Sequence, residues 1–131
     1  MVYAAKHKVT LNKPIVVKLC ILELSRLIMY KFYYDYQKPR YGNHCKLLFT
    51  DTDSLCCKIQ NIDLYSNMSE AMDLFDTSNF ESDHPLYSTR NHRVLGKIKS
   101  ETGSVPPGEF VGLRAKMYSL SSENKLQQKV Q

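Results

Sequence analysis

The pattern of apolar and polar positions predicts a mixed α+β fold that begins with one long helix. Between Ile15 and Tyr36 the chain is mostly Leu, Ile, Val and Tyr, with only five charged residues. Asn12 is a suitable cap and Pro14 a suitable first-turn residue, whereas Pro39 prevents further helix. We therefore expect a helix from Ile15 to Tyr36 that is mostly buried, because a helix so poor in charge needs cover from other structure.

The next apolar runs predict a β-hairpin with two carboxylates in its turn. Residues 46–50 and 54–59 are mainly apolar, and Asp51, Thr52 and Asp53 separate them. Two apolar runs joined by a short polar segment are typical of antiparallel strands. The hairpin therefore presents Asp51 and Asp53 at its tip.

The second half of the chain predicts short elements joined by polar connections. Two Gly and two Pro fall within residues 101–108, where they favour a loop over regular structure. In chain order we expect a helix over residues 69–75 capped by Asn67 or Ser69, an exposed loop over 76–93, a strand over 94–99, a loop over 101–108, strand structure over 110–120 and a frayed tail over 121–131.

Length and charge narrow the class of protein. The 131 residues (15.2 kDa) fit one domain, and 43% hydrophobic with 24% charged residues is ordinary globular usage, which excludes a fibrous or disordered chain. A net charge of +5 favours polyanionic partners, nucleic acid first and an anionic membrane surface second. No leader or membrane-spanning run occurs, so we expect an intracellular protein with reduced cysteines and no membrane partner.

The hairpin tip is the first candidate site. Carboxylate oxygens are the ligands that Mg²⁺ prefers, and a strand end would hold Asp51 and Asp53 rigidly, with Thr52 and Ser54 supporting the turn. Such a site could neutralise a triphosphate in nucleotidyl transfer. Asp is also a common turn residue because its side chain bonds the local backbone, and on spacing alone this second explanation is favoured.

The segment from Leu113 to Leu120 is the second candidate site. If it forms one strand, Lys116 and Tyr118 share a face, with Arg114 beside them. A lysine and a tyrosine so placed could hold a nucleic-acid backbone without reading its sequence. The alternative, favoured when this segment is taken alone, is a solvated lysine beside a half-buried tyrosine.

The order of these features carries more information than any one of them. An apolar helix, the Asp-Thr-Asp-Ser hairpin and the Lys-x-Tyr strand follow one another, and further matching segments lie between them. This order resembles family B DNA polymerases, more narrowly the protein-primed subgroup of viruses, linear plasmids and self-replicating DNA transposons. The segments that carry the resemblance are residues 11–15, 22–25, 38–42, 47–54, 83–88, 94–97 and 110–119, the last three being most similar to transposon-derived copies.

The resemblance implies roles for these residues in a DNA-directed DNA polymerase. Asp53 would be a catalytic ligand of Mg²⁺ or Mn²⁺ with Asp51 close by, while Lys116, Tyr118 and Arg114 would hold the primer–template DNA. Residues 1–60 would belong to the polymerase palm, 61–120 to its continuation towards the thumb, and 121–131 to a polar tail.

The resemblance also sets expectations about what lies outside this chain. The family's motifs D-x-x-S-L-Y-P and K-x-x-x-N-S-x-Y-G, which supply the second palm aspartate and a nucleotide-binding lysine, do not occur in it. We therefore expect a fragment that is inactive alone and needs upstream polymerase domains, deoxynucleotides and a terminal-protein primer. A transposon origin implies a nuclear location. The alternatives are a non-enzymatic DNA-binding remnant and a pseudogene product.

Overall fold

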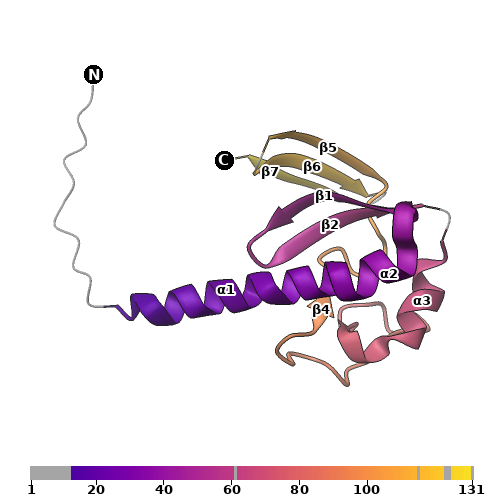
Figure 1. Cartoon of the computed structure of the whole chain (residues 1–131). Helices are drawn as coiled ribbons and strands as arrows, with labels where there is room; N and C mark the ends of the chain where they lie inside the picture. Colours follow the sequence, from indigo (N-terminus) through magenta and orange to yellow (C-terminus); the bar gives the residue numbers. More distant parts are fainter. Residues whose placement is uncertain (1–12, 61, 115, 123–124, 131) are drawn as a thin grey trace.

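A mixed α+β fold is confirmed by the computed structural model, which describes residues 13–60, 62–114, 116–122 and 125–130. A long helix leads into a two-stranded sheet, a short helix and a packed loop follow, and a three-stranded sheet comes last. Figure 1 shows the two-stranded sheet between the long helix and the three-stranded sheet. The first hairpin therefore has neighbours on both sides.

The long helix continues past the end that Pro39 predicts. Helix α1 (Ile15–Lys31) passes into a π-helical segment (Phe32–Gln37) and then into α2 (Lys38–Tyr41). The wider π turn shifts the hydrogen bonds, so that Lys38 N–H reaches the Tyr33 carbonyl, five residues back. Because the missing N–H and bulky ring of proline are then tolerated, the sequence prediction of a stop near Tyr36 is wrong.

Both ends of this helical stretch have a local explanation. At the start, Pro14 occupies the N-cap position instead of the first turn, and the expected cap Asn12 lies outside the described residues. At the end, Gly42 adopts φ +52°, a left-handed conformation that glycine tolerates best. A short 3-10 turn (Gly42–His44) then leads into the first strand.

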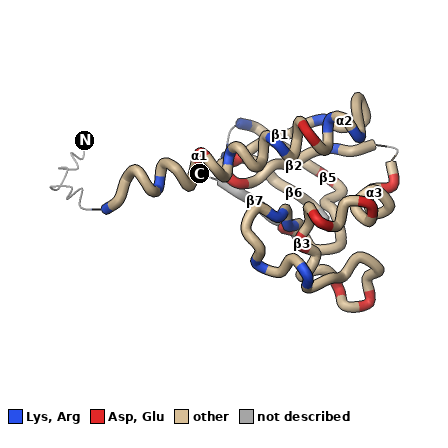
Figure 2. The backbone as a smooth tube through the Cα atoms, turned by 60° about the horizontal axis from the view of Figure 1, so that its bottom comes forward, with Lys and Arg blue, Asp and Glu red and all other residues tan. Residues whose placement is uncertain are grey.

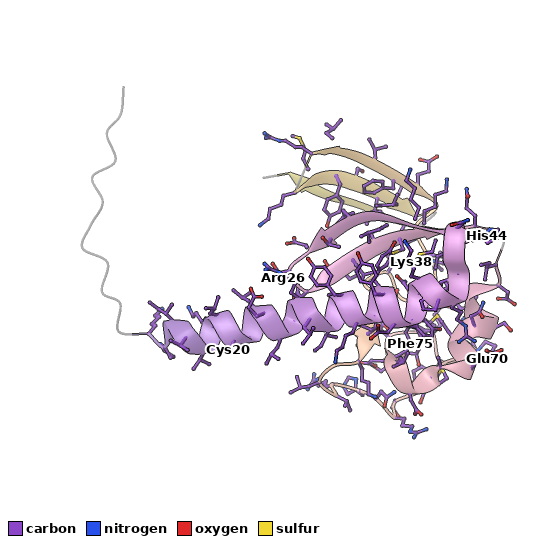
Figure 3. The ribbon with its side chains drawn as sticks, viewed as in Figure 1. Cys20, Arg26, Lys38, His44, Glu70 and Phe75 are labelled. Carbon is purple, nitrogen blue, oxygen red and sulfur yellow. The ribbon has the colours of Figure 1, made fainter. Side chains whose placement is uncertain are left out.

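Helix α1 is exposed, contrary to the burial that its composition predicts. None of its residues is buried, and large apolar side chains such as Val16 (72% exposed) and Leu24 (58%) face solvent. Figure 3 shows side chains, including the labelled Cys20, projecting from the part of α1 that extends beyond the other described elements. The described residues therefore leave this apolar surface uncovered.

The predicted hairpin is confirmed. Strand β1 (Cys45–Asp51) pairs antiparallel with β2 (Ser54–Ile59), and Thr52 with Asp53 forms the connection between them. The register shifts between Leu47 and Phe49, so that one extra residue bulges out of β1.

The short helix begins earlier than the sequence predicts. Helix α3 spans Leu64–Glu70, and Asp63 caps it by accepting hydrogen bonds from the N–H groups of Tyr65 (3.1 Å) and Ser66 (3.2 Å). The expected caps Asn67 and Ser69 lie inside the helix. A 3-10 turn (Met72–Leu74) follows it.

The loop over residues 76–93 is irregular and mostly exposed, as expected, but Asp76, Thr77, Phe80 and Leu86 within it are buried. Phe80 and Leu86 join Met68 and Phe75 in the main buried apolar cluster, against which Phe32 of the π segment also packs. Apolar residues spaced widely along a polar loop thus form core without helix or strand periodicity.

The predicted strand over residues 94–99 is reduced to its last two residues. Strand β4 (Ile98–Lys99) pairs in parallel with β3 (Phe75–Asp76), whereas Val94 and Leu95 lie in exposed turns, Leu95 at 97% exposure. The predicted loop over residues 101–108 is confirmed.

The last sheet replaces the single strand that residues 110–120 suggest. Strands β5 (Glu109–Arg114) and β6 (Met117–Ser122) form a second hairpin, and β7 (Lys125–Val130) pairs with β6. The tail expected to fray is thus an antiparallel edge strand. Figure 2 shows Lys and Arg interspersed with Asp and Glu along the chain in that view, so the net positive charge is not gathered on one element there.

Candidate functional site

The two carboxylates of the first hairpin differ in their surroundings. Asp51 ends β1 opposite Ser54, is half-buried, and accepts a hydrogen bond at Oδ1 from the Thr52 N–H (2.9 Å). Asp53 is exposed and lines a groove below the hairpin. Asp51 therefore has the turn-forming contact that the alternative explanation expects, and Asp53 is the more accessible of the two carboxylates.

An aromatic contact joins the first hairpin to the second. The Phe49 ring, two residues before Asp51, stacks on the Tyr118 ring with centroids 4.2 Å apart and planes at 28°. Phe110 stacks on Phe49 from the neighbouring strand at 5.7 Å. The two candidate sites, separated by more than sixty residues in sequence, are therefore neighbours in space.

The basic residues of the second candidate site flank a turn instead of sharing a strand face. Lys116 has φ +62° and connects β5 to β6, whereas Tyr118 lies within β6. Arg114 ends β5, and both Arg114 and Lys116 are exposed. The predicted Lys116–Tyr118 face is thus wrong, and a solvated lysine beside a half-buried tyrosine describes this segment.

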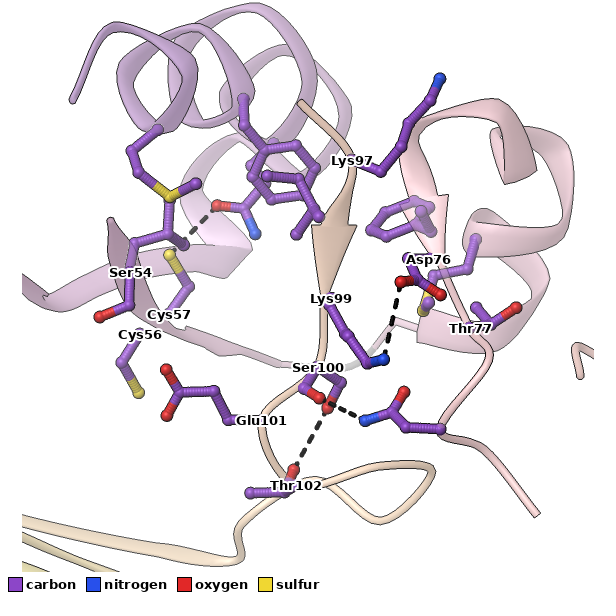
Figure 4. A pocket seen from close by; sticks show the side chains of 18 of the residues that line it. Ser54, Cys56, Cys57, Asp76, Thr77, Lys97, Lys99, Ser100, Glu101 and Thr102 are labelled. Atoms are coloured by element: carbon purple, nitrogen blue, oxygen red, sulfur yellow. Dashed lines mark hydrogen bonds and ion pairs between the residues drawn. The ribbon is translucent and has the colours of Figure 1, made fainter. Parts of the chain in front are cut away.

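A groove of about 690 Å³ lies between the π segment, the hairpin and the strand β4 region. Figure 4 shows Cys56 and Cys57 on one wall, Asp76 and Thr77 on the other, and the chain from Lys97 to Thr102 between them. Its surface is mainly apolar, and its charged lining residues are Asp53, Asp76, Lys97, Lys99 and Glu101. This volume lies within the range of small-molecule sites.

A buried carboxylate organises one wall of this groove. Asp76 is 6% exposed and accepts hydrogen bonds from the N–H groups of Ser78 (3.0 Å) and Arg93 (3.4 Å), and Lys99 Nζ lies 3.6 Å away. Burial raises its pKa, but these hydrogen bonds and Lys99 outweigh burial and lower the pKa to about 2. Sequence reasoning missed this residue, although Asp76-Thr77-Ser78 is a composition in which aspartate bonds the backbone two residues on.

The opposite wall holds a buried amide beside a thiol. Gln37 is 7% exposed, and its Oε1 accepts a hydrogen bond from Cys57 Sγ (3.1 Å). Burial, followed by the neighbouring Cys45 thiol, raises the pKa of Cys57 far above its ordinary value. Burial and the Glu101 carboxylate likewise raise the pKa of Cys56. Both thiols are therefore protonated at neutral pH.

Asp53 and Asp51 are the residues that would hold a divalent cation. Mg²⁺ is commonly bound through one or two protein carboxylates, with substrate phosphates and water completing its shell, and Asp53 is accessible for this. Within the described parts of the chain, no three His, Cys, Asp or Glu side chains gather into a metal-binding group. The donor set fits a cation that substrate helps to bind.

Comparison with known proteins identifies no relative: no family model, curated protein or solved structure matches the chain. Among the described residues, no helix has both the length and the apolar character needed to cross a membrane.

Proposed function

We propose that the chain is part of a family B DNA-directed DNA polymerase, which transfers deoxynucleotides to a primer 3′ end. In this proposal Asp53 is a ligand of Mg²⁺ or Mn²⁺, Asp51 shapes the turn, and Arg114 and Lys116 contact the primer–template backbone. The chain alone is inactive, because the residues that would complete the two-metal site belong to upstream polymerase domains.

The stacking of Phe49 on Tyr118 is the observation that carries this proposal. Phe49 precedes Asp51 by two residues and Tyr118 follows Lys116 by two residues, so the contact joins the two segments that one duplex end would meet in this proposal. A metal supplies charge neutralisation for a triphosphate when bound, and a basic turn nearby holds the backbone that accepts the nucleotide.

The second candidate function is DNA binding without catalysis. It is favoured by the exposure of Arg114 and Lys116 at one turn, because two exposed cations can bind phosphates without a metal. The two functions differ in what Asp53 contributes, because a purely electrostatic binder is indifferent to the carboxylate.

The test is binding of a fluorescently labelled primer–template duplex, followed by anisotropy over a salt series with and without Mg²⁺. We expect Mg²⁺ to strengthen binding of the native chain and Asp53→Asn to abolish that gain, while the exposed loop residue Asp83 serves as control in Asp83→Asn. Lys116→Gln should lower the salt slope by about one in either function. Binding that ignores both Mg²⁺ and Asp53→Asn would reject the polymerase site in favour of the second candidate.

A further inference from the structure

The groove contains a buried hydrogen-bond donor that the rest of the structure leaves unused. Gln37 Oε1 accepts from the Cys57 thiol, but Nε2 has no hydrogen-bond partner among the described residues. The only fully enclosed side-chain polar atom without a partner there is the Tyr41 hydroxyl, so Gln37 Nε2 retains access to the open space of the groove that Gln37 lines. An amide this buried normally has its donors satisfied.

The orientation of this amide follows from the thiol beside it. Because Cys57 is protonated at neutral pH, its S–H is a donor and requires the oxygen of the amide. The –NH₂ group is therefore the part directed away from Cys57. An amide turned the other way would set two donors against each other.

The π segment explains why this glutamine reaches the groove. Bonding five residues back brings residues five apart to one side of the helix, and Phe32 and Gln37 both line the groove. Phe32 contacts Phe75 edge-to-face at 5.7 Å, so the donor lies beside an aromatic wall. The π turn that accommodates Pro39 thus also sets the polar group of the groove.

The charges around the groove restrict the ligand. Lys99 is paired with Asp76, and Lys97 Nζ donates to the Asp73 backbone carbonyl, while Asp53 and Glu101 contribute two negative charges. With the positive charge of Lys97 included, the lining residues carry a net negative charge, which disfavours anionic ligands. A mainly apolar groove of this size, which holds a buried amide donor without a partner among the described residues, suits an uncharged molecule.

We propose that this groove binds a small, uncharged aromatic molecule whose carbonyl oxygen accepts a hydrogen bond from Gln37 Nε2. The proposal stands apart from the polymerase proposal, since it requires neither Asp53 as a metal ligand nor DNA. The aromatic ring would lie against Phe32 and Phe75, with the Cys57 thiol holding the glutamine amide in place.

Three bicyclic probes test the proposal on the native chain. Coumarin carries a carbonyl acceptor, naphthalene matches its size without one, and coumarin-3-carboxylate adds a negative charge. Chemical-shift titration should show coumarin binding at millimolar concentration or better, with the Gln37 side-chain –NH₂ resonances moving, and should show both other probes about tenfold weaker.

Variants supply the matched comparison. Gln37→Met preserves the side-chain length without a donor and should weaken coumarin about tenfold, whereas Gln60→Met, at an exposed glutamine, should leave it unchanged. Equal affinity for coumarin and naphthalene, no coumarin binding at millimolar concentration, or unmoved Gln37 resonances would each overturn the proposal. These resonances are read on the native chain, so the decision stands even if Gln37→Met does not fold.

Discussion

Replacing Asp76 by asparagine tests whether a buried charge holds the 76–93 loop in place. The carboxylate is 6% exposed, and its partners come from three separate positions, Ser78, Arg93 and Lys99. Asparagine keeps one oxygen as an acceptor for Ser78 but removes the charge that Lys99 faces. The side chain keeps its size, but an –NH₂ group replaces Oδ2, the acceptor for the Arg93 N–H, so the variant removes the charge and that hydrogen bond together.

The expected magnitude follows from the pKa of Asp76. A decrease from 3.8 to about 2 corresponds to at most about 2.4 kcal/mol of stabilisation. Lys99 is 42% exposed, so solvent screening reduces its part, and we expect Asp76→Asn to cost about 1–2 kcal/mol at pH 7. Because the folded pKa is lowered, the stabilisation is complete above pH 3.8 and is lost as the pH falls through about 2.

Urea unfolding followed by far-ultraviolet circular dichroism measures this difference. The free energy of unfolding should differ between native and Asp76→Asn chains at pH 7 and 5, and the difference should shrink as the pH falls below 3.8. The control is Asp73→Asn, whose ion pair with Arg90 is more than three-quarters exposed on both sides and should contribute less than about 0.5 kcal/mol. A loss of stability of the same size at pH 2 and pH 7 would refute the electrostatic explanation.

Two further predictions concern the long helix. Leu19 and Leu24 are 57% and 58% exposed, so the isolated chain should self-associate. The double variant Leu19→Glu, Leu24→Lys should shift the chain towards the monomer in analytical ultracentrifugation. A native chain that stays monomeric at high concentration would contradict this prediction. The second prediction concerns Gly42, where φ is +52° and no atom lies within 4 Å of an added Cβ. Gly42→Ala should therefore lower the free energy of unfolding in urea by about 1 kcal/mol through backbone strain alone. An unchanged unfolding midpoint would show that the turn relaxes.

Local signals predicted the first hairpin well and the bounds of the helices poorly. The two mainly apolar runs on either side of Asp51–Asp53 predicted the first hairpin nearly to the residue, because strand patterning and turn chemistry agree there. Pro39 gave a false helix end, because its effect depends on whether the preceding turn can widen. Asp63 capped a helix that the sequence placed further along, since capping residues are common and only tertiary packing selects among them.

In the candidate sites, too, features set by neighbouring residues were predicted and features set by tertiary contacts were not. Asp51 and Asp53 lie at the turn that the sequence predicts. Lys116 lies in a turn between β5 and β6, where the sequence pattern predicts a continuous strand. The contact between Phe49 and Tyr118 depends on two hairpins meeting, and no local spacing encodes it. Gln37 and Asp76 were missed for a related reason: polar residues look solvent-exposed in sequence until their partners are known.

Helix α1 shows what an apolar pattern does and does not determine. Its composition indicates that the side chains are more stable when buried, but it does not indicate which structure buries them. Burying a single leucine contributes about 2 kcal/mol, so the exposed residues of α1 together represent a large free energy that the described residues leave unused. Among the described residues, Phe80 and Leu86 pack into the buried cluster, whereas the apolar side chains of α1 stay uncovered. If the polymerase proposal is correct, the surface that covers α1 belongs to the same upstream domains that would complete the carboxylate site, and adding those domains should remove self-association and confer activity together.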